Sequence, residues 1–175
     1  SAVSIVRMDN RNESLDELSR LKIVLDKIST IAEPGSSVYL LSRYKSRIPS
    51  DNQLKTLASS YPSLKFKTDT MHASKGKEAE YVVILDMENG AKGFPARKKE
   101  NEVLELMLPE LDDFPDAEER RLFYVALTRA KHRVDILVDM AKASSFILEL
   151  LKGKYSLELD EFKVSLTQKN SHDLK

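Results

Sequence analysis

Two kinds of apolar pattern alternate along the chain, and this alternation leaves few folds open to it. Short runs typical of strands occupy residues 3–9, 38–41, 64–70, 81–87 and 134–138. Apolar residues at helical spacing fill the stretches between them, over residues 14–31, 51–60, 115–131 and 143–152. Strands that alternate with helices favour an α/β fold with a mainly parallel sheet flanked by helices. Ligands of such sheets bind beyond the carboxyl ends of the strands.

Capping signals mark where the first two helices begin. Ser14 and Glu17 have the spacing of a capping box, and Ser50 and Gln53 repeat it. Residues 88–115 are the least regular part of the chain. We expect one domain over residues 1–166, followed by a polar, disordered tail over residues 167–175.

Composition excludes several classes of function. Lys plus Arg and Asp plus Glu number 28 each, so any contact with nucleic acid must be local. The chain has no cysteine, which excludes thiolate chemistry and fits a reducing compartment. We find no apolar run long enough to cross a bilayer and no signal peptide. We therefore expect a cytoplasmic protein without a membrane partner.

Several common ligand motifs are missing from the sequence. The Gly-Lys pairs at residues 76–77 and 153–154 lack both the following Ser or Thr and the earlier Gly of a phosphate-binding P-loop. The dinucleotide-binding pattern G-x-G-x-x-G is absent as well. His72, His132 and His172 are widely spread, which favours surface histidines over a metal site. The chain alone therefore cannot wrap a nucleoside triphosphate in a P-loop.

The segment from Thr70 to Glu78 joins one expected strand to the next and is dense in small and polar residues. Gly76 lets the backbone approach a ligand closely. Lys75, His72 and Thr70 can donate to a phosphate, and Glu78 can accept hydrogen bonds from hydroxyl groups. The alternative is a polar turn with a helical cap, and composition does not decide between the two.

The helical segment that begins near residue 116 carries an arginine of interest. Arg129 continues the apolar stripe of Leu122, Val125 and Ala126, and a buried arginine needs an anionic partner. It is either aimed at a phosphate or caps the carboxyl end of the helix. Arg120 and Arg121 are better explained by pairs with acids three or four residues away on a solvated face.

Two further features carry weaker signals. Arg43 stands just past an expected strand, where sheet-edge ligands bind, although surface arginines are common. The acidic segment 100–119 is interpreted as a solvated face, because it has no calcium-loop pattern. Asp112 and Asp113 could hold Mg²⁺, but this alternative is the weaker one.

Taken together, these segments resemble motifs V and VI of superfamily 1 DNA helicases of the UvrD/Rep type. Motif V of that family reads T-x-H-x-x-K-G-x-E and is followed by an apolar strand. Motif VI reads E-E-R-R-L-x-Y-V-x-x-T-R-A. Both patterns stand here in the right order, as residues 70–78 (TMHASKGKE) and as residues 118–130 (EERRLFYVALTRA). The stretch HASKGKEAEYVVIL, the downstream GFPA and DFPDAEERRLFYVALTRAKHRV are similar to the helicase IV branch, and LLSRYKSR is similar to motif IV.

The resemblance implies a RecA-like fold, with this chain as the second of two such domains. ATP and Mg²⁺ would then be bound mainly by an N-terminal RecA-like domain that carries the P-loop. By position in the motifs, Arg129 and Arg43 would be catalytic arginines that reach the γ-phosphate across the interface. Glu78 would lie near the ribose, and Gly76 and Lys75 would belong to the same cofactor-binding loop.

The same resemblance implies a track for single-stranded DNA. Thr70, His72 and Ser74 would lie along it, close to the DNA backbone. Two departures from the family bear on this. Lys77 and Ala79 replace an apolar and an aromatic residue common in motif V, and 26 residues separate Arg43 from Thr70, which leaves no room for the DNA-contacting insertion of many relatives.

The function expected is therefore the C-terminal motor domain of an ATP-dependent DNA helicase that translocates on single-stranded DNA. The alternative is a non-enzymatic module that binds DNA or a protein in DNA repair, and zero net charge slightly favours contacts with protein over strong binding of free DNA. A helicase-fold remnant attached to a nuclease is a third possibility. A P-loop encoded upstream of the chain would distinguish the motor from the module.

Overall fold

The computed structural model describes residues 2–8, 16–90, 93–95, 116–153 and 155–161. These residues form six strands and four helices, together with two short 3₁₀ turns, and the third strand is followed by the fourth without a helix between them. The strands are β1 (Ala2–Met8), β2 (Ser37–Ser42), β3 (Lys65–Thr70), β4 (Ala79–Ile84), β5 (Ala130–Asp139) and β6 (Leu157–Glu161). The helices are α1 (Glu17–Ile31), α2 (Asp51–Ser60), α4 (Ala117–Leu127) and α5 (Ser145–Lys152), and the turns are η1 (Lys45–Arg47) and η2 (Met140–Lys142).

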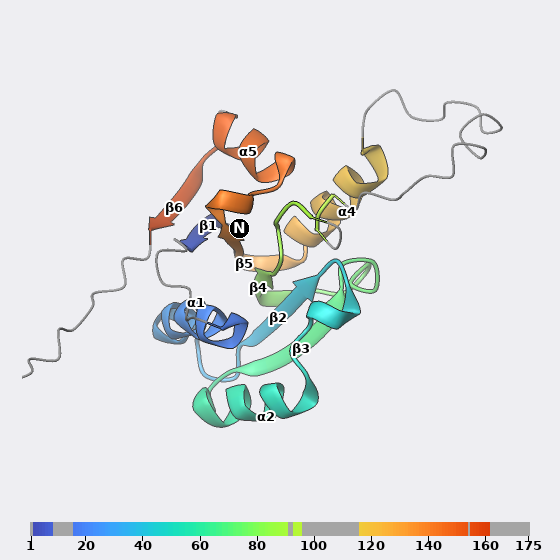
Figure 1. The fold of residues 1–175 in the computed structure, drawn as a ribbon. Helices are drawn as coiled ribbons and strands as arrows, with labels where there is room; N and C mark the ends of the chain where they lie inside the picture. The colour runs from blue at the N-terminus through green and yellow to red at the C-terminus, as the bar shows by residue number, and fades with distance from the viewer. Residues whose placement is uncertain (1, 9–15, 91–92, 96–115, 154, 162–175) are drawn as a thin grey trace, which may run out of the picture.

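All six strands form one sheet in the order β3-β2-β4-β5-β1-β6 (Figure 1). Every pairing between neighbouring strands is parallel. Each connection must therefore run from the carboxyl end of one strand back to the amino end of the next. Helices or loops on the faces of the sheet make these connections. The α/β fold with a mainly parallel sheet, predicted from the alternation of patterns, is confirmed.

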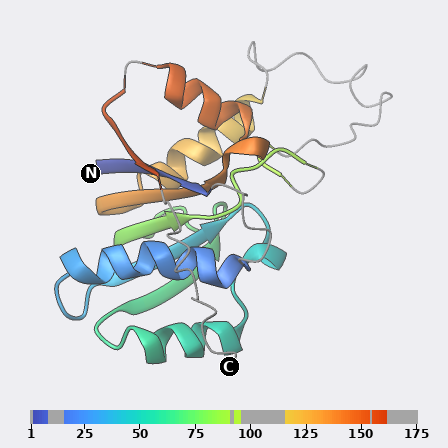
Figure 2. The same ribbon diagram turned by 60° about the vertical axis from the view of Figure 1, so that its left-hand side comes forward.

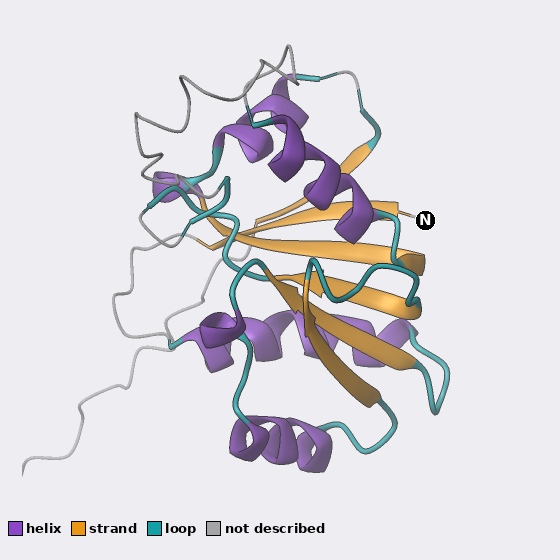
Figure 3. Cartoon of the chain, turned by 90° about the vertical axis from the view of Figure 1, so that its right-hand side faces the viewer, coloured by secondary structure: helices purple, strands orange, loops and turns teal. Residues whose placement is uncertain are grey.

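Helices cover both faces of the sheet. Helices α1 and α2 lie on one face, and α4 and α5 lie on the other (Figures 2 and 3). Strand β2 is buried on both faces: Val38 and Leu40 pack in the core under α1 and α2, whereas Tyr39 and Leu41 pack in the core under α4 and α5. A strand with two buried faces reads as a continuous apolar run, which is how residues 38–41 appear in the sequence.

The helix starts follow their capping residues. The predicted capping box of α2 is present, with Ser50 and Gln53 each bonded to the other's backbone. Helix α1 begins later than predicted. Its N-cap is Asp16, whose side chain accepts from the Ser19 amide at 2.7 Å, and residue 14 lies outside the described part of the chain. An aspartate at the N-cap satisfies the same orphan amides that the predicted serine would have served.

Further boundaries and one strand differ from the sequence prediction. Helix α4 ends at Leu127 rather than near Lys131, because Ala130 already pairs with Ala79 of β4. Strand β5 accordingly starts four residues before the predicted Val134. Strand β6 was not predicted at all. Residues 96–115 of the irregular segment and the predicted tail over residues 167–175 lie outside the described residues, and the domain bounds 1–166 stay a prediction.

Candidate nucleotide and DNA site

The loop of residues 71–78 connects β3 to β4 on the sheet face that α4 covers. It begins at the carboxyl edge of the sheet, where the Met71 amide donates to the Ser42 carbonyl at 2.9 Å. Buried Ser74 then fixes the turn: its amide donates to the Thr70 carbonyl at 3.1 Å, and its hydroxyl donates to the Met71 carbonyl at 2.7 Å. Gly76 follows with a φ of +79°, a conformation that side chains with a Cβ rarely adopt.

The second half of this loop presents polar side chains to solvent. Lys75 and Glu78 are exposed, and their side chains make no hydrogen bond or ion pair with the described residues. Lys77 is engaged instead, with its ammonium 2.7 Å from Asp69. Asp69 also accepts from the buried Tyr39 hydroxyl at 2.5 Å. Burial and this bond to Asp69 raise the pKa of Tyr39 above its ordinary value of 10.

Arg129 lies just beyond the carboxyl end of α4 rather than on its apolar stripe. Its Nε donates to the Val125 carbonyl at 2.9 Å, so the predicted cap of the helix end is formed. The two terminal nitrogens donate to the Lys77 carbonyl at 3.2 Å and to the Thr128 hydroxyl at 3.1 Å. The guanidinium thus joins the helix to the loop through uncharged acceptors, and no carboxylate of the described residues forms an ion pair with it.

Arg43 is held differently. It follows β2 and meets Glu119 of α4 with two nitrogens: Nη2 lies 2.7 Å from Oε1, and Nε lies 3.1 and 3.0 Å from the two carboxylate oxygens. The side chains are only 15% and 10% exposed. These bonds raise the pKa of Arg43 above its ordinary value. Its remaining terminal nitrogen lies 3.5 Å from Nδ1 of His72.

The structure therefore sorts the predicted site residues into two groups. Arg43, Thr70 and His72 lie at the carboxyl edge of the sheet, whereas Arg129 lies at the opposite edge, where β4 and β5 begin. Helix α4 separates the groups, and its span from Glu119 to Leu127 is about 12 Å. The rule that ligands bind beyond the carboxyl ends of strands locates the first group but not the second.

Sequence reasoning missed the role of Glu119. It was included in the solvated acidic segment, yet it is buried and paired with Arg43. Its position three residues before Leu122 and seven before Ala126 places it on the apolar stripe, and that spacing was the available signal. Arg120 is exposed as predicted, and it pairs with Glu149 of α5, at 2.5 and 2.7 Å.

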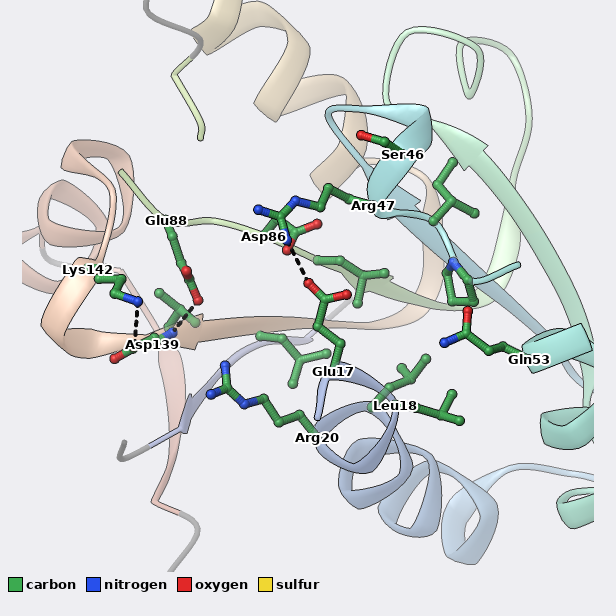
Figure 4. A pocket seen from close by; sticks show the side chains of 16 residues that line it. Glu17, Leu18, Arg20, Ser46, Arg47, Gln53, Asp86, Glu88, Asp139 and Lys142 are labelled. Carbon is green, nitrogen blue, oxygen red and sulfur yellow. Dashed lines mark hydrogen bonds and ion pairs between the residues drawn. The ribbon is translucent and has the colours of Figure 1, made fainter. Parts of the chain in front are cut away.

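A hollow lies at the carboxyl edge, on the side of the sheet that α1 covers. It has a volume of about 350 Å³ and is lined by charged side chains, among them Glu17, Arg47, Asp86 and Asp139 (Figure 4). Arg47 pairs with Glu17 at 3.0 Å across it. Asp86 adopts a left-handed conformation and accepts from the Ser42 hydroxyl at 3.2 Å. Burial, aided by Glu17, raises the pKa of Asp86 from 3.8 to about 6.

Replacing Asp86 by asparagine should stabilise the fold at neutral pH. The folded chain keeps the Asp86 proton up to about pH 6, whereas the unfolded chain releases it near its ordinary value of 3.8, so Asp86 destabilises the fold as the pH rises from 4 to 6. Asparagine carries no charge and tolerates the left-handed backbone. We expect Asp86→Asn to raise the free energy of unfolding at pH 7 by about 1–2 kcal/mol, and to have almost no effect at pH 4. Urea unfolding at both pH values checks this, and an equal change at both would contradict it.

Neither a metal centre nor a membrane span is found among the described residues. No group of three His, Cys, Asp or Glu side chains there could hold a metal ion. No described helix is long and apolar enough to cross a bilayer. The predicted Mg²⁺ pair at residues 112–113 lies outside the part of the chain that the structure describes.

Comparisons with known proteins agree with this architecture. The model of the UvrD-like helicase C-terminal domain matches residues 7–138. The chain is 43% identical over 150 residues to DNA helicase IV of Escherichia coli (strain K12), which covers 86% of this chain and 22% of that protein. It is 34% identical over 113 residues to a probable DNA helicase II homolog of Mycoplasma capricolum, which covers 59% of this chain and 14% of that protein.

The chain thus spans less than a quarter of the length of either relative. Both motifs of the site, at residues 70–78 and 118–130, lie inside the matched range. The predicted RecA-like class is confirmed by this match together with the parallel sheet and its two helical layers. On these grounds the chain belongs to the UvrD-like helicase C-terminal domain family.

Proposed function

We propose that this chain is the C-terminal motor domain of an ATP-dependent DNA helicase that translocates on single-stranded DNA. The observation that carries the proposal is the state of Arg129. Three uncharged oxygens fix its guanidinium in place and leave its charge without an ion-pair partner in the described chain. A positioned arginine of this kind can stabilise the charge that develops on a phosphoryl group during transfer.

The side chains around Arg129 suit a nucleotide. The nucleotide would be held by a partner domain, which we propose is an N-terminal motor domain of the same protein that binds ATP and Mg²⁺ next to Arg129. Lys75 offers a cation, Glu78 offers a carboxylate for the ribose hydroxyls, and the space around Gly76 is open. Bound Mg²⁺-ATP would supply the phosphoryl group, and the part of this chain is to place Arg129 at the γ-phosphate when the two domains close.

The proposed DNA track runs along the carboxyl edge of the sheet. His72 is exposed there, and Thr70 lies partly buried beside it, with its hydroxyl accepting from the Ala73 amide at 3.3 Å. Ser74 contributes to the proposed track only indirectly in this structure. Its side chain is buried and stabilises the loop through the hydrogen bond to the Met71 carbonyl. Two arginines at one phosphate were predicted, but Arg43 cannot join Arg129 without leaving Glu119, so we assign the phosphate contact to Arg129 alone.

The proposal predicts that the 175-residue chain does not hydrolyse ATP by itself, with or without single-stranded DNA, because it has no P-loop lysine. The complete protein should hydrolyse ATP, and single-stranded DNA should stimulate it. Phosphate release measured on both proteins, with and without an oligonucleotide, tests this. DNA-stimulated hydrolysis by the chain alone would contradict the proposal that a separate N-terminal domain supplies the P-loop. A complete protein that is inactive would favour a module that binds DNA or a protein without catalysis.

A further inference from the structure

Arg43 and Glu119 form an enclosed ion pair, with side chains only 15% and 10% exposed. The guanidinium meets both carboxylate oxygens, at 2.7–3.1 Å, and its Cζ stacks 5.2 Å from the centre of the Tyr44 ring. Two-point contacts of this kind fix the relative orientation of the two side chains as well as their distance. The pair therefore fastens the end of β2 to the first turns of α4.

The free edge of the same guanidinium faces the proposed DNA track. Its Nη1 lies 3.5 Å from Nδ1 of His72, which is exposed on the loop of residues 71–78. A DNA backbone that engages His72 would change the position of that ring, and Arg43 is the group directly behind it. Because Arg43 is held by Glu119 on its other side, displacement of the arginine reaches α4.

Helix α4 connects Glu119 to Arg129. Glu119 shares the buried face of the helix with Leu122 and Phe123, so the helix moves as one packed unit. At its other end the Arg129 amide donates to the Ala126 carbonyl at 3.2 Å, and the Arg129 side chain returns to the loop at the Lys77 carbonyl. The loop and the helix are thus joined at both ends, by His72 with Arg43 and Glu119 at one end and by Arg129 with Lys77 at the other.

We propose that Arg43 is a positioning residue: through Glu119 and α4 it couples occupancy of the DNA track at His72 to the placement of Arg129. The inference rests on the proposed function and deepens it, because it states how DNA stimulates hydrolysis. Arg43 need not touch the nucleotide in this scheme. Coupling of two sites through a packed element with fixed ends is the physical form such regulation takes.

Two substitutions in the complete protein test the coupling. Glu119→Gln removes the charge that holds Arg43, and Arg43→Lys keeps the positive charge but loses the two-point contact. The quantity to measure is the ratio of kcat with saturating single-stranded DNA to kcat without DNA. We expect each variant to lower this ratio about tenfold. Glu149→Gln is the matched control. It breaks the exposed ion pair between Glu149 of α5 and Arg120, the neighbour of Glu119 on α4, and it should leave the ratio unchanged.

The outcomes separate the inference from the function on which it rests. If the unmodified protein shows no DNA-stimulated hydrolysis, both fail. If it is stimulated but both variants keep the full ratio, the coupling is overturned and the motor stands. A loss confined to DNA affinity, measured by fluorescence anisotropy with a labelled oligonucleotide, also overturns it, since Arg43 would then only shape the track. Thermal unfolding shows whether the Glu119→Gln protein folds. If it does not fold, the ratio measured for Arg43→Lys decides whether the coupling exists.

Discussion

Replacing Arg129 by alanine should lower the DNA-stimulated rate of ATP hydrolysis by the complete protein at least about 10³-fold. The guanidinium is held by the Val125 and Lys77 carbonyls and the Thr128 hydroxyl, and none of these acceptors neutralises its charge. Alanine removes the charge together with the hydrogen bonds that position it. Phosphate release at saturating ATP and DNA measures the effect, and binding of a labelled oligonucleotide should be retained because Arg129 lies at the opposite edge of the sheet from His72.

Lys131→Ala is the matched control for this experiment. Lys131 is a neighbouring cation, but it is exposed and its ammonium lies 3.8 Å from Glu80, so it has an ion-pair partner already. Its removal should leave the rate unchanged. If Arg129→Ala were as active as the unmodified protein, Arg129 would be a cap of the helix end and no more. The structure shows that cap, and therefore the assay has to separate the two roles.

The fold was largely predictable because most of its signals are local. The continuous apolar run of β2 and the capping box of α2 depend on neighbours in sequence, and both are confirmed. Strand β6 was missed because its pattern is short and half exposed, with Glu158 between two leucines. Its pairing with β1 joins segments at opposite ends of the chain, which no local pattern records.

The site was predictable in its residues and less so in its arrangement. The motifs locate Arg43, His72 and Arg129 along the chain. They do not show that Arg43, after β2, and Arg129, after α4, lie at opposite edges of the sheet, because that follows from how the helix crosses the face. Likewise, Glu119 reads as one acid of an acidic segment until the packing buries it against Arg43. Buried charge pairs between distant segments are set by tertiary structure.

Phe94→Ala should lower the free energy of unfolding by about 3–5 kcal/mol. The ring is fully buried between the two helices of one face, with its centroid 5.9 Å from that of Phe123 in α4 and 5.4 Å from that of Phe146 in α5. The ring meets Phe123 tilted and Phe146 edge-on, and such aromatic contacts stabilise the fold beyond the effect of the apolar area that they bury. The Phe94 amide also donates to the Glu88 carbonyl at 3.0 Å, so the segment that carries the ring is fixed beneath it.

The same ring supports the helix on which the proposed coupling depends, and its loss should therefore loosen α4 as well as destabilise the domain. Urea unfolding followed by circular dichroism gives the free energy. Tyr124→Ala is the control on the same helix: that ring is 69% exposed, and its removal should cost no more than about 0.5 kcal/mol. A cost of Phe94→Ala as small as that of Tyr124→Ala would show that residues 93–95 do not pack into the core. A large cost for Phe94→Ala beside a small one for Tyr124→Ala would show that the buried aromatic contacts of α4 stabilise the domain and that its exposed ring does not.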